Sequence, residues 1–282
     1  MVRPTDISPI SRVMRRIDLV ADGSLSGDTS RTGFPSIDRW LGGGVRAGDL
    51  VVLGGDVGSG KSALALAMAL RMAETGGKVA FLTGEMSVER VMERALAIEG
   101  RVKVDDLRQG KLDDLQRAAV GAAAVRLRDR SPKFEVMRLE EPDRFESRLR
   151  ELAAQVVLVD GLETLAASSR RTDEELAAAV RLLKAAAVQE DVCIIVTAQL
   201  PAWVSRPDPR PTLDDLGALG AVKQVADVVL ALYREEMYAP DAGVEGATEL
   251  LVRKNRNGTT GYVDLYFYKQ WLRFEDMLDP DR

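Results

Sequence analysis

The sequence of 282 residues has no histidine and a single cysteine, Cys193. One cysteine excludes a disulfide within the chain, and the lack of histidine removes a principal ligand of zinc sites, so any metal must be held by oxygen. The chain also has no excess of positive charge. It contains 39 Lys and Arg residues and 44 Asp and Glu residues, which gives a formal net charge of −5. The chain therefore lacks the overall basic field that binds nucleic acid nonspecifically, and any such contact must be local.

Long apolar runs are absent as well. No run reaches the roughly 20 residues that a membrane-spanning helix needs, and the segment from Met1 to Val20 has no continuous apolar stretch. We therefore expect a cytoplasmic protein with no membrane partner. A hydrophobic content of 46% is enough for a large core, and the length suits one principal domain. Residues 22–32 are almost entirely small or polar, which predicts an N-terminal segment with a flexible linker at 1–31 and one domain at 32–282.

Short apolar runs alternate with longer segments of helical periodicity over most of the chain. Strands are expected at 50–53, 79–82, 134–137, 156–159 and 192–198, with helices such as 62–74 and 174–189 between them. This alternation predicts an α/β fold with a mostly parallel central sheet flanked by helices. The last part contains strands at 228–232, 249–252 and 262–267 with little helix, which predicts an antiparallel C-terminal extension at one sheet edge.

A glycine-rich segment lies between the first of these strands and the helix that follows it. Its residues are Gly55, Asp56, Val57, Gly58, Ser59, Gly60, Lys61 and Ser62, which match the phosphate-loop motif in the strand–loop–helix context it requires. In such a loop backbone amides face the phosphates, Lys61 reaches the terminal phosphates and the Ser62 hydroxyl ligates magnesium. An ordinary glycine turn is the alternative, but chance gives the pattern in only about one per cent of chains this long. We therefore predict binding of ATP with Mg²⁺.

Asp160 directly follows the strand at 156–159, so its carboxylate is expected at the carboxyl edge of the sheet, where ligands of open α/β sheets bind. Paired with the phosphate loop, it is the best candidate to hold Mg²⁺ through the water shell of the ion. The alternative is an aspartate that only begins the turn before Gly161. The pairing with the phosphate loop favours the metal role.

Hydrolysis also needs a group that orients and deprotonates the attacking water. Glu85 follows the strand at 79–82 and is a candidate, although a solvated glutamate at the start of a helix would occupy the same position. Glu163, just beyond Asp160, is a rival. Gln199 follows the strand at 192–198 and is a candidate sensor of the terminal phosphate, or simply a surface polar residue.

A basic segment, Arg253 to Gly258, follows a late strand and ends in an Asn-Gly dipeptide. The simpler interpretation is a charged hairpin with a tight turn. The functional alternative is that Lys254 and Arg256 project into the nucleotide of a neighbouring subunit, as arginine fingers supplied in trans do. The residues alone favour the simpler interpretation.

Taken in order, these segments resemble the RecA-like motor domain of the DnaB-type replicative hexameric helicases. The resemblance covers nearly everything from Thr32 to Phe274, and it is specific because many separate blocks keep their order and approximate spacing. The matching blocks are Thr32-Gly33-Phe34-Pro35-Ser36-Ile37-Asp38-Arg39, the phosphate loop with Ala63-Leu64-Ala65-Leu66, Glu85-Met86-Ser87, Leu107-Arg108-Gln109-Gly110-Lys111-Leu112, Ala198-Gln199-Leu200, Arg210-Pro211-Thr212-Leu213-Asp214-Asp215-Leu216, Ala226-Asp227-Val228-Val229, Tyr233-Arg234-Glu235-Glu236-Met237-Tyr238 and Lys254-Asn255-Arg256-Asn257-Gly258.

The resemblance implies a RecA-like P-loop NTPase and assigns roles to the candidate residues. In that family the matching glutamate is the catalytic base, so Glu85 moves ahead of Glu163, and Gln199 matches the phosphate sensor. Lys254 and Arg256 match a pair that completes the site of the adjacent subunit. The chain is thus expected to form a homo-oligomer, a hexameric ring with ATP sites between subunits, which acts in DNA replication on single-stranded DNA.

Some features depart from this family. Only a short segment precedes Thr32, so the resemblance leads us to expect no N-terminal helical domain of the kind these helicases have, and Gly161 stands where they have tyrosine or a similar residue. The stretch Gly217-Ala218-Leu219-Gly220 replaces the usual Arg-Glu-Ser-Gly of a loop that contacts DNA, which removes polar contacts to the backbone. Two segments, Leu41-Gly42-Gly43-Gly44 and Leu82-Thr83-Gly84-Glu85, are more similar to RadA and KaiC relatives.

Two functions therefore remain open. The first is a motor on single-stranded DNA, with Arg170, Arg171, Arg206 and Arg210 as candidate channel residues, although loop arginines are more often simply solvated. The second is a non-helicase ATPase switch that regulates assembly or a protein partner. Intact phosphate-loop and carboxylate residues argue against a nucleotide binder that no longer turns over.

Overall fold

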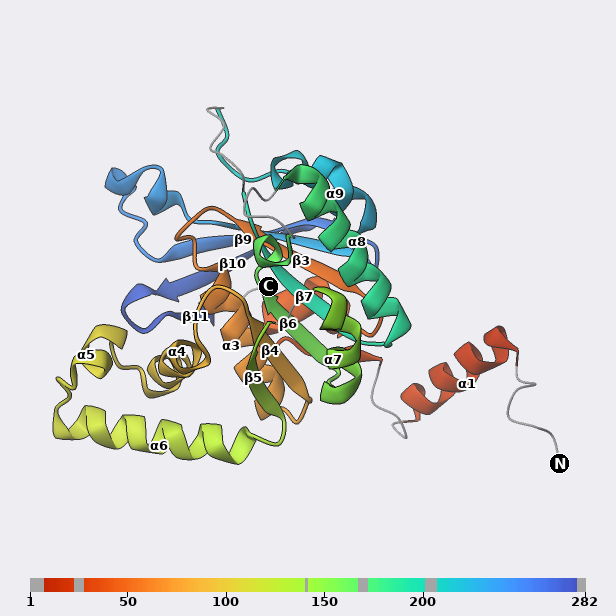
Figure 1. Ribbon diagram of the computed structural model, residues 1–282. Helices are drawn as coiled ribbons and strands as arrows, with labels where there is room; N and C mark the ends of the chain where they lie inside the picture. The colour runs from red at the N-terminus through yellow and green to blue at the C-terminus, as the bar shows by residue number, and fades with distance from the viewer. Residues whose placement is uncertain (1–7, 23–27, 140–141, 167–171, 201–206, 278–282) are drawn as a thin grey trace.

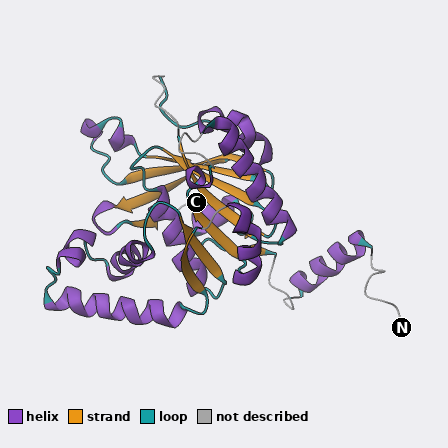
Figure 2. Ribbon diagram, viewed as in Figure 1, coloured by secondary structure: helices purple, strands orange, loops and turns teal. Residues whose placement is uncertain are grey.

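The computed structural model describes residues 8–22, 28–139, 142–166, 172–200 and 207–277. Figure 1 shows an α/β domain in which helices cover both faces of a central sheet, and Figure 2 separates the strands from the helices. Within the described residues the large sheet has nine strands, in the spatial order β11-β10-β9-β8-β3-β7-β6-β4-β5.

The six strands from β8 to β5 are parallel to one another. In spatial order they are β8 (Val228–Tyr233), β3 (Leu50–Gly55), β7 (Cys193–Gln199), β6 (Val156–Asp160), β4 (Val79–Thr83) and β5 (Phe134–Arg138). Beyond β8 the sheet continues with antiparallel strands, namely β9 (Ala247–Asn255), β10 (Gly261–Tyr268) and β11 (Arg273–Asp276). β9 and β10 form the hairpin predicted around the Asn-Gly turn.

The two faces of the sheet bury two separate cores. Alternation along β3 sends Val51 and Leu53 to one core and Leu50 and Val52 to the other. The first face is covered by α2 (Pro35–Trp40), α3 (Lys61–Glu74) and α4 (Val88–Gly100), and the second by α7 (Phe145–Leu152), α8 (Asp173–Gln189) and α9 (Ala221–Val225). Two further helices, α5 (Val104–Gln109) and α6 (Asp114–Arg130), pack outside α4. The rigid sheet fixes where each strand delivers its last residue.

The predicted α/β class, with a mostly parallel sheet and antiparallel C-terminal strands, is confirmed. One detail is wrong. The sequence groups the strand at 228–232 with the antiparallel extension, but β8 is parallel to β3 and only its outer neighbour β9 is antiparallel. The connection from β7 to β8 contains α9, and a connection of this length returns the chain to the starting end of the sheet.

The N-terminal part contains elements that the sequence did not indicate. Helix α1 (Pro9–Ala21) begins after Ser8, whose hydroxyl accepts a hydrogen bond from the Ser11 amide, and it lies apart from the sheet in Figure 1. Strand β1 (Thr29–Ser30) pairs with β2 (Val45–Arg46), so the end of the predicted linker belongs to the folded body. None of the helices in the described residues has both the length and the apolar character to cross a bilayer.

Candidate nucleotide site

Four parallel strands bring the phosphate loop, Glu85, Asp160 and Gln199 to one edge of the sheet. Strand register places Gly55 of β3 beside Gln199 of β7, and Thr83 of β4 beside Asp160 of β6. Glu85 follows two residues after Thr83. Because the carboxyl ends of parallel strands meet at the same edge, the phosphate loop, the two carboxylates and Gln199 lie where open α/β sheets have their ligand-binding crevice.

The loop between β3 and α3 has the backbone that phosphate binding requires. Gly58 and Gly60 have φ values of +78° and +103°, which residues with a side chain rarely adopt. Gly60 directly precedes α3, and a Cβ on it would lie 2.9 Å from the Phe274 ring. Both glycines are therefore needed for this loop to turn its amides toward the N-terminus of α3, where anions bind.

Lys61 is half-buried and its ammonium group donates to the Asp56 carbonyl oxygen at 2.8 Å. Burial lowers the pKa of Lys61, and the nearby carboxylates of Glu163, Glu85 and Asp160 oppose that shift. The ammonium group is therefore in electrostatic contact with every predicted acidic residue of the crevice. Such a desolvated cation suits an anionic ligand such as a terminal phosphate.

A buried arginine that sequence reasoning missed supports the phosphate loop. Arg234 is 3% exposed, and its guanidinium donates to the Gly58 carbonyl at 3.0 Å and lies 4.8 Å above the Phe267 ring. The Tyr238 hydroxyl donates to Asp56 Oδ2 at 3.3 Å. Both residues come from one block of the sequence, Tyr233 to Tyr238, so that block holds the outer turn of the loop in place.

Asp160 is 1% exposed, and two hydroxyl groups donate to the same oxygen of its carboxylate. Ser62 Oγ lies 2.8 Å from Asp160 Oδ1, and Thr197 Oγ1 lies 2.7 Å from it. The other oxygen, Oδ2, is buried and has no hydrogen-bond partner in the described structure. A buried carboxylate oxygen without a donor, beside a serine hydroxyl, fits an oxygen-binding divalent cation such as Mg²⁺.

Glu85 lies in the short loop between β4 and α4, and its side chain is exposed at the crevice. The Thr83 hydroxyl donates to the Met86 carbonyl at 2.9 Å, and the Gly84 amide donates to the Asp160 carbonyl at 2.7 Å. The loop is therefore fixed against β6. Ser87 then caps α4, since its hydroxyl accepts from the Arg90 amide.

The rival carboxylate, Glu163, contacts the end of β7. Its Oε1 accepts a hydrogen bond from the Gln199 backbone amide at 2.6 Å. This contact joins the loop after β6 to the end of β7. Glu163 thus holds the backbone of the predicted phosphate sensor, while Glu85 stands on a separate loop, and both carboxylates act on the charge of Lys61.

Arg94 is a second cation of the site that sequence reasoning missed. It lies on α4 and is half-buried, and burial lowers the pKa of its guanidinium while Asp160 and Glu85 oppose that shift. It stands on the stripe formed by Val91, Ala95 and Ile98, which are buried. A charged residue within an apolar helical stripe is the signal that could have found it.

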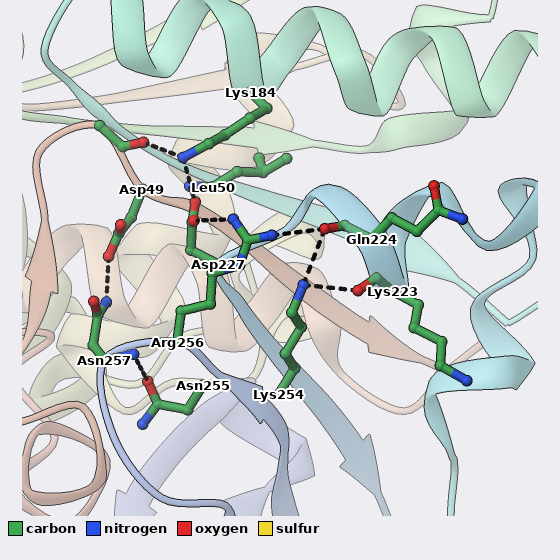
Figure 3. Close-up of polar contacts among 11 residues, drawn as sticks. Asp49, Leu50, Lys184, Lys223, Gln224, Asp227, Lys254, Asn255, Arg256 and Asn257 are labelled. Carbon is green, nitrogen blue, oxygen red and sulfur yellow. Dashed lines mark hydrogen bonds and ion pairs between the residues drawn. The ribbon is translucent and has the colours of Figure 1, made fainter.

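Lys254 and Arg256 lie near Leu50, at the opposite end of β3 from the phosphate loop (Figure 3). Lys254 is paired with Val229 at the start of β8, and Arg256 contacts Asp227, whose carboxylate accepts from the amide of Leu50, the first residue of β3. Five residues at about 3.3 Å each separate Leu50 from Gly55, or about 16 Å. The structure therefore does not bring these two cations to the phosphate loop of their own chain.

The candidate channel arginines are only partly described. Arg170, Arg171 and Arg206 lie outside the described residues. Arg210 makes two hydrogen bonds of 2.6 Å to the carboxylate of Glu249 and stacks over the Tyr233 ring. Hydrogen bonding with Glu249 raises the pKa of Arg210. Arg210 is thus occupied within its own chain.

The fold and the site together define a RecA-like P-loop nucleotide-binding domain. The family model described as DnaB-like helicase C terminal domain matches residues 30–276. The chain therefore belongs to the DnaB-like helicase C-terminal domain family.

Relatives with curated names agree with this membership. The chain is 31% identical over 269 residues to replicative DNA helicase DnaB of Geobacillus stearothermophilus, which covers 91% of this chain and 58% of the relative. It is also 31% identical over 258 residues to replicative DNA helicase DnaC of Bacillus subtilis (strain 168), covering 87% of this chain and 56% of that one. The chain thus spans a little over half the length of these relatives.

Solved structures show the same fold. One solved ATPase domain superposes with a TM-score of 0.86 at 23% identity, covering 97% of this chain and 100% of that one. A DnaB-like replicative helicase, solved in a study of its interactions with primase, gives a TM-score of 0.85 at 22% identity over 97% of this chain and 68% of its own. The KaiC-like protein PH0186 from Pyrococcus horikoshii OT3 gives 0.61 at 18% identity, covering 88% and 98%. The predicted resemblance, including its weaker KaiC component, is confirmed.

Proposed function

We propose that this chain is an ATP-hydrolysing motor domain that works on single-stranded DNA as a ring of identical subunits. The proposal depends on one observation, namely that Lys61 lies far from the two other basic residues assigned to the ATP site, Lys254 and Arg256. Lys61 stands in a crevice with Asp160, Glu85 and Gln199, whereas Lys254 and Arg256 lie at the far end of β3. A cation that cannot reach its own site but is half-exposed at a surface suits a site completed by a neighbour.

Each residue of the crevice has a distinct proposed task. The phosphate loop binds the triphosphate through its amides and Lys61, and Ser62 with Asp160 would hold Mg²⁺, which supplies charge neutralisation between the phosphates when bound. Glu85 accepts a proton from the attacking water, and Gln199 senses the terminal phosphate. Arg256 and Lys254 of the next subunit neutralise the charge that develops on the transferred phosphoryl group.

Helix α1 supports self-association. Its apolar residues Ile10, Met14 and Ile17 are 66%, 51% and 51% exposed and fall on one face. A contiguous apolar face of this kind on a helix usually marks a protein contact. A second copy of this chain is the proposed partner, and we propose a hexamer as the assembled state.

A non-helicase switch is the alternative. The uncharged stretch from Gly217 to Gly220 and the engagement of Arg210 by Glu249 favour it, because both reduce the positive charge offered to a DNA backbone.

The discriminating experiment is the steady-state ATPase rate with and without single-stranded DNA at two salt concentrations, with native mass measured in the same buffers. Lys61→Ala serves as the inactive control. The motor predicts stimulation by DNA that weakens as salt rises, since phosphate contacts release counterions. A rate that is indifferent to DNA in a confirmed oligomer would favour the switch.

A further inference from the structure

Asp227 is a buried carboxylate that belongs to a matching block of the sequence but lies outside the nucleotide site. Its side chain is 8% exposed and accepts three hydrogen bonds (Figure 3). The donors are Lys184 Nζ at 2.6 Å, the Leu50 amide at 2.8 Å and Arg256 Nη1 at 3.1 Å. A buried carboxylate satisfied by two cations and an amide holds those partners in fixed positions.

The two proposed trans cations have further acceptors on the segment just before Asp227. Arg256 Nη2 donates to the Gln224 carbonyl at 2.8 Å, and Lys254 Nζ donates to the Lys223 carbonyl at 2.7 Å and to that of Gln224 at 3.3 Å. These carbonyls lie at the end of α9, where helical carbonyl groups lack partners within the helix. Asp227 is the charged member of this set of acceptors.

Arg256 is held on one side and remains open on the other. Its side chain is 49% exposed, whereas Asp227 is almost fully covered. The two side-chain hydrogen bonds use two of the five N–H donors of a guanidinium, so others are left for an external anion. Its backbone amide also donates to the Asp227 carbonyl at 2.9 Å. The contacts therefore fix the position of Arg256 without consuming it.

We propose that Asp227 is a positioning residue for the shared ATP site, and this inference rests on the proposed function. Its carboxylate fixes the guanidinium of Arg256 in the orientation that meets the phosphate of the neighbouring subunit. Fixing a long side chain in advance removes the entropy cost of ordering it when the phosphoryl group is transferred. Through Leu50 the same carboxylate ties Arg256 to the strand that carries the phosphate loop of its own subunit.

A purely structural role of Asp227 and a role in positioning Arg256 for the neighbouring subunit would affect different subunits when Asp227 is replaced. If Asp227 only closes the beginning of β3, its loss weakens the subunit that carries the change. If it positions Arg256, its loss weakens the site of the neighbour. The direction of the defect between two kinds of subunit therefore separates the two roles.

The test uses mixed oligomers of two variants of the full chain. The acceptor subunit carries Arg256→Ala and keeps its phosphate loop, and the donor subunit carries Lys61→Ala and keeps Arg256. The mixture is expected to hydrolyse ATP better than either variant alone. Adding Asp227→Asn to the donor should lower kcat of the mixture by about tenfold with little change in KM. Adding it to the acceptor should change kcat by no more than roughly twofold.

Asp49→Asn in the donor is the matched control. Asp49 directly precedes Leu50, but its carboxylate accepts a hydrogen bond from Asn257 Nδ2 at 2.7 Å rather than from Arg256. It should leave the rate of the mixture unchanged. If Asp227→Asn subunits do not fold, as judged by thermal unfolding, Asp227→Glu takes their place, because it keeps the charge but moves it by one methylene. The same directional loss is expected.

The possible results of the mixing experiment distinguish the role of Asp227 from the existence of the shared site. An equal loss in both arms, or no loss in the donor arm, contradicts positioning by Asp227 while leaving the shared site intact. If the unmodified pair forms mixed oligomers but never regains activity, the shared site itself is wrong, and the role of Asp227 fails with it.

Discussion

At the scale of the residue, the carboxylate of Asp160 is the feature that best suits the proposed site to a cation. Two hydroxyl groups, from Ser62 and Thr197, donate to Oδ1, and Oδ2 stays buried without a donor in the described structure. Such an arrangement costs desolvation free energy, which a bound cation would offset. Thr197 was not predicted, because a threonine in a buried strand ordinarily indicates only a part of the core.

Thr197→Val should weaken the proposed metal site, because it removes one of the two hydroxyl groups that donate to the Asp160 carboxylate. We expect the Mg²⁺ concentration for half-maximal ATPase activity to rise by about tenfold, as for other partners of metal-binding carboxylates. The measurement is an Mg²⁺ titration at saturating ATP. Thr248→Val is the matched control, since Thr248 is equally buried but its hydroxyl donates to the Gly246 carbonyl. An unchanged half-point for Thr197→Val would remove Thr197 from the site.

Glu85 and Glu163 are rival candidates for the base, and they stand on different loops. Glu85→Gln should lower kcat by about 10²-fold or more with little effect on KM, because the water loses its proton acceptor. Glu163→Gln keeps an oxygen that accepts from the Gln199 amide, so its loss should be smaller. Single-turnover hydrolysis with both variants measures this ranking. The reverse ranking would make Glu163 the base.

At the scale of elements, the sequence predicted the strands well but ended most of them too early. Apolar runs stop at Leu53, Val159 and Leu82, whereas β3, β6 and β4 continue to Gly55, Asp160 and Thr83. Ladder hydrogen bonds involve the backbone and continue past the last apolar side chain. The added residues are polar or glycine and line the crevice, so the chemistry of the site resides in positions that hydropathy does not mark as strand.

Other elements gave too little signal to be predicted. On α6 the buried residues are Ala123 and Leu127, so most of its surface is exposed and no apolar stripe appears. The parallel direction of β8 depends on a long crossover and on its neighbour β3, which no local pattern encodes. Of the site, the phosphate loop could be predicted because its residues are contiguous, and the carboxylates because each follows an apolar strand, with the family resemblance ranking Glu85 first. Arg94, Arg234 and Asp227 could not, since tertiary packing decides their roles.

The junction where β3, α8 and the β9–β10 hairpin meet should show acid-sensitive stability. Burial raises the pKa of Asp227, but hydrogen bonds from Lys184, Leu50 and Arg256 outweigh it and leave the pKa below its ordinary value. A carboxyl group with a lowered folded-state pKa stabilises the fold above the ordinary range near 4, and this contribution is lost as pH falls through the folded pKa.

Asp227→Asn should therefore reduce the free energy of unfolding by about 2 kcal/mol at pH 7 and by clearly less near pH 3.5. Urea unfolding of the native and variant chains at the two pH values measures the difference. A difference that is equal at both values would mean that the charge of Asp227 contributes nothing to the junction.

At the scale of the whole molecule, the proposed ATP site has two parts that one chain does not bring together. One end of β3 carries a phosphate loop with its carboxylates, and the other end carries two cations that are held by Asp227 and the end of α9. The about 16 Å between these ends is the reason that one subunit alone should be a poor ATPase. Head-to-tail contact between identical subunits would bring the two ends together, and such contacts form a ring when the rotation between subunits closes.

The most direct test of the shared site is ATP turnover per subunit measured against protein concentration, with native mass recorded at each point. Turnover should rise steeply over the concentration range in which the oligomer forms, and Arg256→Ala should assemble over the same range without that rise. Turnover that stays constant from monomer to oligomer, with Arg256→Ala as active as the native chain, would contradict a site completed by a neighbour.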